Sequence, residues 1–480
     1  MTGLDRWPDF PEALRRRMAE VYGVEPAQVL PTRGATHALE LVFRLAALDG
    51  ARAVAARRTP ITERLARISR LALAEAQGPG VGAVVMASPS EPLGEVLAPS
   101  EVRALAEKAA PALLVIDEST VEFADTPSLA ALTGEIGNLV VLRSLSFAYG
   151  LAGARCGAAI ARPDVIAWLE EVTEPLAIPQ PVIALAESAL SPSRALLVES
   201  RLRLNKTEQS RLLSALETSP AVSAVTSGQG PFLFVEVRDP DTVRPALARL
   251  GVSAVWREDV APGGLRLDIG SPEANDRALA ALGAVASDRP RRRAEAVRDT
   301  KETRIAVAID LDTPGSVQAQ TGVGFYDHML EQVATHGGFS LSLACEGDLH
   351  IDPHHVLEDC ALALGAALKT ALGDKRGIGR FGFLLPMDEA EAQVSLDLGG
   401  RPYSVFEGSF RDARIGDYPT EMTAHVFRSL AESLGASIHI KVEGENDHHK
   451  TEACFKALGR ALRQAIRIEG SDIPSTKGVI

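Results

Sequence analysis

Two copies of one short pattern, His-His-x-x-Glu, lie in the last third of the chain. The first copy runs from His354 to Glu358, and the second runs from His448 to Glu452. On a helix, residues i and i+4 lie on one face, whereas residues i and i+1 point about 100° apart. The first histidine and the glutamate of each copy can therefore hold one metal ion. An imidazole and a carboxylate together suit Mn, Fe or Zn better than Mg or Ca.

The second histidine of each copy, His355 or His449, must point away from the ligand pair on its own helix. Two such helices that face each other would exchange these histidines and complete two metal sites. The alternative is that both pairs are solvated surface residues. A single motif would leave that alternative open, but two copies in one domain favour a two-metal site and hence an enzyme.

The histidines are concentrated in one part of the chain, since nine of the ten follow residue 320. His328 precedes the first His-His pair, and His425 precedes the second at a similar distance. This spacing indicates an internal duplication in which each half supplies one histidine and then one His-His-x-x-Glu motif. Each ion would then have four protein ligands and room for substrate or water.

Composition limits the class of protein. A chain of 480 residues should hold two or three domains. The formal net charge of −13 argues against a nucleic-acid partner. The sequence has no signal pattern and no stretch of about 20 apolar residues, and its four cysteines lack CxxC spacing, as in reduced thiols of a cytosolic protein. We therefore expect a cytoplasmic protein without a nucleic-acid or membrane partner.

The pattern along the chain predicts two different halves. Continuous apolar runs alternate with helical patterns before residue 288, as in a parallel α/β sheet, and a smaller α+β section begins at 232–237. After residue 300, period-two alternation takes over. We expect one domain at residues 1–287, a charged linker at 288–300 and a second domain at 301–480. The predicted strands of the first domain lie at 81–86, 112–116 and 138–142, with a helix at 100–110.

Residues 301–480 resemble imidazoleglycerol-phosphate dehydratase, an enzyme of histidine biosynthesis. The matching stretches include Thr-Gly-Val-Gly-Phe-Tyr-Asp-His-Met-Leu at 321–330, Gly-Asp-Leu-His-Ile-Asp at 347–352, Pro-Met-Asp-Glu-Ala at 386–390 and Ser-Thr-Lys-Gly at 475–478. The resemblance implies a duplicated α+β domain whose halves are like ribosomal protein S5 domain 2. It also implies two Mn²⁺ ions per site and trimers that build a 24-subunit shell with sites shared between subunits.

The same resemblance assigns roles to individual residues. It gives one ion to His328, His355, His448 and Glu452, and the other to His354, Glu358, His425 and His449. It implies phosphate binding by Arg380, Arg401, Ser475 and Lys477, and substrate contact or catalysis by Glu302, His336 and Glu358. The group that transfers the proton stays open between Glu358, Glu302 and a metal-bound water.

The first domain resembles a pyridoxal-phosphate-dependent aminotransferase of fold-type I, nearest histidinol-phosphate aminotransferase, most clearly at residues 138–157. Phe147 stands where the family has its Schiff-base lysine, so no internal aldimine can form. Glu91 and Thr120 replace a ring-contacting Asn and a Tyr of the family. The family's contacts to the pyridine nitrogen, cofactor phosphate and substrate remain as Asp117, Arg155 and Arg266.

These observations predict a manganese-dependent hydro-lyase behind a degenerate aminotransferase-like domain. The reaction implied is conversion of D-erythro-imidazole-glycerol phosphate to imidazole-acetol phosphate and water. One alternative is a bifunctional dehydratase and aminotransferase, and Phe147 argues against it. Another is a regulatory or assembly role for the first domain, and a third is that this domain still binds a phosphate ligand.

Overall fold

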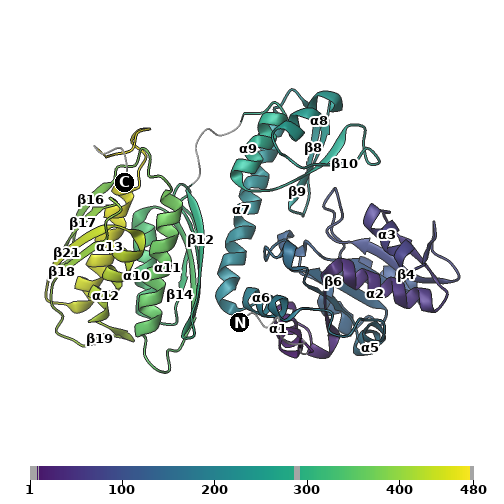
Figure 1. Ribbon diagram of the computed structural model, residues 1–480, viewed down its shortest axis with the longest axis horizontal. Coiled ribbons are helices and arrows are strands. Elements are labelled where there is room, and N and C mark those ends of the chain that lie inside the picture. The colour runs from purple at the N-terminus through teal and green to yellow at the C-terminus, as the bar shows by residue number, and fades with distance from the viewer. Residues whose placement is uncertain (1–7, 9, 286–291, 476–480) are drawn as a thin grey trace. The chain divides into compact units, whose positions relative to one another are not determined.

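The computed structural model describes residue 8 and residues 10–285 and 292–475 (Figure 1). The chain forms two compact units. Unit 1 comprises Met1–Ser191 and Arg201–Asp288, and unit 2 comprises Pro192–Ser200 and Arg289–Ile480. Each unit is described by itself below.

Unit 1 is built on a seven-stranded sheet in the order β1-β7-β6-β5-β4-β2-β3. Strands β2, β4, β5 and β6 run parallel. Their apolar residues pack into two separate hydrophobic cores, one on each face of the sheet. This confirms the predicted α/β pattern, in which strands buried on both faces read as continuous apolar runs. The strands are β1 (Val29–Thr32), β2 (Arg52–Ala55), β3 (Ala72–Leu73), β4 (Val81–Ala87), β5 (Leu113–Asp117), β6 (Leu139–Ser144) and β7 (Gly157–Ile160). The helices are α1 (Glu12–Tyr22), α2 (Ala35–Leu48), α3 (Pro60–Ile68), α4 (Pro99–Ala109), α5 (Pro163–Glu171) and α6 (Gln180–Ala189).

A smaller α+β section completes unit 1. Its four-stranded sheet has the order β10-β11-β9-β8 and shares a core with α8, α9 and the C-terminal part of α7. The elements are β8 (Val222–Ser227), β9 (Phe232–Val237), α8 (Pro240–Arg249), β10 (Val255–Trp256), β11 (Gly264–Asp268) and α9 (Pro272–Ala281). The long helix α7 (Pro192–Glu217) precedes this section. Among the described residues no single helix is long and apolar enough to cross a membrane, although the bent pair α6 and α7 passes by length and composition alone.

Unit 2 consists of two similar halves, as the histidine spacing predicts. Each half contributes a four-stranded sheet, in the orders β12-β13-β15-β14 and β16-β17-β21-β18, and four helices lie between the two sheets (Figure 1). The first half comprises β12 (Arg293–Asp299), β13 (Thr303–Asp310), β14 (Val317–Gln320), α10 (Gly324–Gly337), β15 (Ser340–Gly347) and α11 (His354–Leu372). The second comprises β16 (Phe381–Met387), β17 (Ala390–Asp397), β18 (Tyr403–Glu407), the short hairpin β19 (Arg414–Ile415) and β20 (Tyr418–Pro419), α12 (Met422–Leu434), β21 (Ser437–Glu443) and α13 (Asp447–Ala465).

The expected linker at 288–300 requires a correction. Arg293–Asp299 form strand β12, which pairs antiparallel with β13 along its whole length. Ala294 lies in the core and Ala296 packs against it, whereas Glu295 between them is exposed, as on a half-buried strand. The charge density of this stretch hid the alternation because the inward residues are two alanines and Arg298, which pairs with Asp359. Residues 286–291 lie outside the described part of the chain.

The outer faces of the two sheets in unit 2 differ. On β13, Ala306 and Ala308 point away from the main core and are buried against Leu197 of the Pro192–Ser200 segment. On β17, the residues of the outer face are exposed and polar, and the inward residues are buried in strict alternation. The first sheet therefore has an outer surface of small residues that this segment covers.

Candidate metal centre

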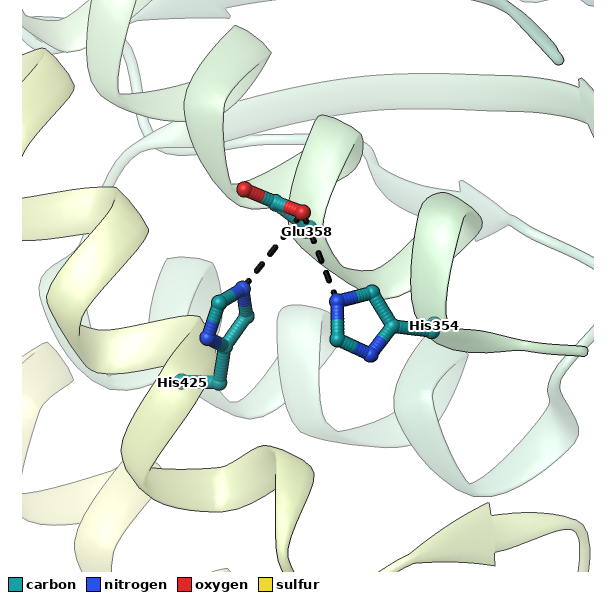
Figure 2. A group of neighbouring side chains, drawn as sticks. All are labelled: His354, Glu358 and His425. Carbon is teal, nitrogen blue, oxygen red and sulfur yellow. Dashed lines mark ion pairs between the residues drawn. The ribbon is translucent and has the colours of Figure 1, made fainter.

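The first cluster of metal-ligand residues joins α11 of the first half to α12 of the second half. The Nε2 atom of His354 lies 3.5 Å from Oε2 of Glu358, one helical turn away, and Nε2 of His425 lies 3.4 Å from the same oxygen (Figure 2). The two imidazole rings are 4.9 Å apart. The ligand atoms of all three residues lie within 4.8 Å of one another. This places on one face the pair that the i, i+4 argument predicted.

The second cluster repeats this arrangement with the halves reversed, because α13 of the second half packs against α10 of the first. Nε2 of His448 lies 3.4 Å from Oε2 of Glu452, and Nε2 of His328 lies 3.8 Å from Oε1 of the same residue. Lys456, one turn further along α13, donates a hydrogen bond of 2.7 Å to Glu452. Each cluster thus takes its His-x-x-x-Glu pair from one half and its third residue from the other.

Both motifs lie at the very start of their helices, and local hydrogen bonds hold them there. The Asp352 carboxylate accepts from the backbone N–H of His354 at 2.7 Å. Asn446 caps α13 by accepting from the backbone N–H groups of His448 and His449 at 2.9 and 3.4 Å. After the first turn both helices become largely buried. The caps therefore fix the start of each helix, where the ligand side chains lie. The rest of each helix packs into the hydrophobic core.

The second histidine of each motif faces a carboxylate outside both clusters. Nδ1 of His355 lies 3.2 Å from Asp348, and Nδ1 of His449 lies 2.8 Å from Glu389. These hydrogen bonds raise the pKa of both imidazoles. The expected direct exchange between the two motif helices does not occur within this chain, because α11 packs against α12 and α13 against α10. Three of the four residues expected for each ion come together, and His355 and His449 do not join them.

The residues of the clusters fit a divalent metal ion. Nε2 of His425 is buried and has no hydrogen-bond partner within the described part of the chain, although a neutral imidazole nitrogen normally finds one. It points at Glu358, 3.4 Å away, and a bound cation would satisfy both groups. Two imidazoles and one carboxylate form a donor set that suits Mn, Fe or Zn.

Two further predicted residues lie beside the histidines. Oε2 of Glu302, in the turn before β13, lies 3.8 Å from Nε2 of His355. Nε2 of His336 lies 3.0 Å from Oε1 of Gln332, whose amide nitrogen is 3.2 Å from Nε2 of His328. Burial lowers the pKa of His336, and the charges of Lys456 and Arg460 lower it further.

Sequence reasoning missed Gln332 and Lys456 as members of the site. Gln332 bridges His328 and His336, which are eight residues apart on α10, and Lys456 binds Glu452 on α13. Both residues are one helical turn from a predicted ligand, so the i, i+4 spacing that found the glutamates would also have found them.

The expected phosphate-binding residues are only partly described. The Arg380 guanidinium donates to Asp397 at 2.6 and 3.0 Å and to the carbonyl of Pro474 at 2.9 Å, which brings it beside Ser475. Its backbone φ is 66°, a conformation that residues other than glycine rarely adopt. A Cβ atom at Gly399 would lie 2.8 Å from this guanidinium, so glycine leaves room for it. Arg401 is exposed, and Lys477 lies outside the described residues.

Asp117 and Arg155, which are expected to line a cofactor pocket in unit 1, are hydrogen-bonded to residues close to them in sequence. Phe147 is 50 % exposed at the position of the missing lysine. Asp117 accepts hydrogen bonds from Ser119, and burial raises the pKa of its carboxyl. Arg155 donates to Ser146 and to the carbonyl of Ala152, both at 3.3 Å. Asp117 and Arg155 therefore have separate partners.

Arg266 and Glu91, two of the residues that the resemblance places in the pocket, pair with each other. The guanidinium of Arg266 forms an ion pair with Glu91 and a second one with Asp268 at 2.9 Å. Thr120, at the position of the missing Tyr, is buried. Arg266 and Glu91, both of which the resemblance places in a ligand pocket, thus neutralise each other.

Fold and site together define a two-part protein, with a fold-type I unit and a duplicated α+β unit that carries a histidine-rich candidate metal centre. Residues 321–462 match the family model of imidazoleglycerol-phosphate dehydratase, and residues 68–282 match that of aminotransferase class I and II. The chain belongs to the imidazoleglycerol-phosphate dehydratase family by its C-terminal unit and carries an aminotransferase-like domain in front of it.

Curated relatives match part of the chain. The histidine biosynthesis bifunctional protein HisB of Actinobacillus pleuropneumoniae serotype 3 (strain JL03) is 58% identical over 195 residues, covering 41% of this chain and 54% of that protein. The protein of the same name from Stenotrophomonas maltophilia (strain R551-3) is 59% identical over 183 residues, covering 38% and 51%. The chain therefore spans about half the length of these relatives.

Solved structures match each unit. The imidazoleglycerol-phosphate dehydratase of Pyrococcus furiosus is 38% identical, with 38% of this chain and 99% of that chain covered and a TM-score of 0.35. The histidinol-phosphate aminotransferase of Clostridium acetobutylicum is 16% identical, with 58% and 90% covered and a TM-score of 0.52. The second likeness shows the fold of unit 1 alone.

Proposed function

We propose that this chain is an imidazoleglycerol-phosphate dehydratase that converts D-erythro-imidazole-glycerol phosphate to imidazole-acetol phosphate and water with two Mn²⁺ ions per site. The observation that carries the proposal is the pair of matching clusters, each made of a His-x-x-x-Glu pair from one half and a histidine from the other. An unpartnered Nε2 on His425 supports a role in holding a cation.

The bound ions would act as Lewis acids on the imidazole of the substrate and as a template for its orientation. The proton to be removed is on a carbon and is not acidic, so stabilising negative charge on the imidazole assists loss of the hydroxyl group. Glu302 and Glu358 both lie beside metal-ligand histidines, and either can accept a proton at an Oε atom. His336, kept neutral near pH 7 by its lowered pKa, can donate or accept through Nε2.

The substrate phosphate needs cationic partners, and Arg380 is a candidate whose guanidinium makes three hydrogen bonds. Its guanidinium is fixed by Asp397 and by the carbonyl of Pro474. A guanidinium presents paired N–H groups that match a phosphate. Arg401, Ser475 and Lys477 complete the proposed phosphate group.

We further propose that the fourth ligand of each ion comes from another copy of the chain in a trimer-based assembly of up to 24 subunits. Support comes from His355 and His449, which face carboxylates away from their own clusters. Unit 1 is proposed as a scaffold without transamination, because Phe147 replaces the lysine and Glu91 pairs with Arg266. A cytoplasmic location is proposed with this function.

The test is a metal-dependent dehydration assay on the purified full chain. Removing metal with a chelator should abolish conversion of imidazoleglycerol phosphate, and Mn²⁺ should restore it. His354→Ala should lower bound Mn²⁺ from two ions to one per chain and abolish turnover, whereas His439→Ala, at an exposed position of β21, should change neither. Full metal content with near-normal turnover in His354→Ala would refute the assignment.

A further inference from the structure

Two carboxylates contact the histidines that lie outside the clusters. Asp348, which directly follows β15, lies 3.2 and 3.3 Å from Nδ1 of His355. Glu389, which directly precedes β17, lies 2.8 Å from Nδ1 of His449. An ionised carboxylate can only accept hydrogen bonds, so Nδ1 of each ring must carry the proton. In the neutral form of each imidazole, Nε2 is then the nitrogen with the free lone pair.

The free nitrogen is the same one that the cluster histidines use. His328, His354, His425 and His448 all face their glutamate through Nε2. The side chains of His355 and His449 are 34% and 31% exposed, so both keep an accessible surface. All six histidines can thus offer the same atom, Nε2, as a metal ligand.

We propose that Asp348 and Glu389 are positioning residues, each of which sets the tautomer and ring orientation of one histidine so that its Nε2 completes a metal site of a neighbouring copy. Asp348 serves the ion of the second cluster through His355, and Glu389 serves the ion of the first cluster through His449. This inference rests on the proposed function. A carboxylate behind a ligating imidazole orients the ring and raises its basicity, and its loss typically weakens metal binding about 10–100-fold.

A comparison of the two halves shows that a carboxylate at this position does not always contact Nδ1 of the histidine. Glu302 and Glu389 occupy matching places, each in the turn before the second strand of its half, β13 or β17. Glu389 contacts Nδ1 of His449, whereas Glu302 lies 3.8 Å from Nε2 of His355. The two glutamates therefore face opposite nitrogens. In the first half Asp348 takes the supporting role, and Glu302 remains on the side where metal and substrate would lie.

The experiment counts Mn²⁺ bound to the full chain by equilibrium dialysis and elemental analysis, at a free Mn²⁺ concentration that just saturates the wild type. Asp348→Ala and Glu389→Ala should each retain one ion per chain instead of two, with the affinity of the affected site about 10–100-fold lower. Glu389→Gln, which keeps an acceptor oxygen, should lose less affinity than Glu389→Ala. Glu391→Gln, an exposed carboxylate on β17, is the matched control and should bind two ions.

Double variants assign each residue to its ion. Adding His449→Ala to Glu389→Ala should remove no further metal, because both changes affect the same ion. Adding His355→Ala to Glu389→Ala should remove the second ion. A merely structural role would lower the melting temperature of the metal-free protein without this pattern of metal loss.

Retention of two ions with wild-type affinity in both single variants would overturn the inference, as would loss of both ions in either one. A wild-type chain that binds no Mn²⁺ would instead overturn the proposed function itself.

Discussion

The guanidinium of Arg266 is held by the carboxylate of Glu91, 175 positions earlier in the chain. In this chain the positive charge of Arg266 is paired with the negative charge of Glu91. A second carboxylate, Asp268, flanks the same guanidinium. The positive charge of Arg266 is therefore matched by two carboxylates of unit 1 itself.

Unit 1 should have no aminotransferase chemistry. With pyridoxal phosphate the wild-type chain should show no internal-aldimine absorbance and no transamination of histidinol phosphate, because Phe147 offers no amine. Phe147→Lys can restore an aldimine band but not transamination, since Glu91 still occupies Arg266 and Thr120 replaces the Tyr. Absorbance spectra and a coupled transamination assay measure the two effects, and turnover by the wild type would overturn the scaffold role.

Phosphate recognition should depend on Arg380. Arg380→Ala removes a guanidinium that can make charge-assisted hydrogen bonds worth about 1.5–3 kcal/mol each. The apparent KM for imidazoleglycerol phosphate should therefore rise roughly 10–100-fold. Lys477→Ala should act in the same direction. Arg376→Ala is the control, because Arg376 is an exposed residue paired with Asp374. Equal KM values in all variants would remove Arg380 from the site.

Truncation should reveal that β12 belongs to the dehydratase unit. A chain that begins at residue 289 keeps β12, whereas one that begins at residue 301 loses it and leaves β13 as an open sheet edge. It also loses Arg298, which pairs with Asp359 at 2.8 Å, directly beside Glu358. Among the described residues, Asp359 then keeps only the hydrogen bond from Thr303. Loss of a hydrogen bond to a charged group costs about 1.5 kcal/mol, which corresponds to at least roughly 3 °C in Tm for a domain of this size.

Thermal melting of the two truncated proteins, with bound Mn²⁺ measured in parallel, tests this expectation. Both also lack the Pro192–Ser200 segment, so the comparison between them isolates β12. Equal melting temperatures would mean that β12 adds nothing to the unit.

Unit 1 should become less stable in mild acid because of His37. Burial, and then the charge of Arg33, lowers the pKa of this imidazole from 6.5 to about 4. A lowered folded-state pKa means that the unfolded chain binds more protons between these values, so stability is fully present above pH 6.5 and falls toward pH 4. The shift corresponds to at most about 3 kcal/mol.

Tryptophan fluorescence can follow this loss in urea, since all three tryptophans precede residue 289. His37→Gln should flatten the slope between pH 6.5 and pH 4, whereas His439→Gln in unit 2 should not. A wild-type unfolding midpoint independent of pH across this window would contradict the prediction.

From the sequence, the residues that share one face of a helix can be predicted better than the element that packs against that helix. The i, i+4 spacing within each motif fixes His354 beside Glu358, because the helix itself sets that distance. It cannot tell which helix lies opposite, and the motif helices in fact pack against α12 and α10. Only the family resemblance placed His425 with Glu358, and neither argument found the carboxylate contacts of His355 and His449. Strand β12 was missed because charged residues and alanines alternate in it, and alanine is a weak hydrophobic signal.

The outward-facing histidines have a consequence for behaviour at low concentration. When one ion is held by three residues of one copy and one residue of another, metal affinity and self-association become a single linked equilibrium. Any factor by which a second copy tightens Mn²⁺ binding must equal the factor by which Mn²⁺ tightens association of the copies. Dilution alone should then release metal, and added Mn²⁺ should reassemble the protein by mass action.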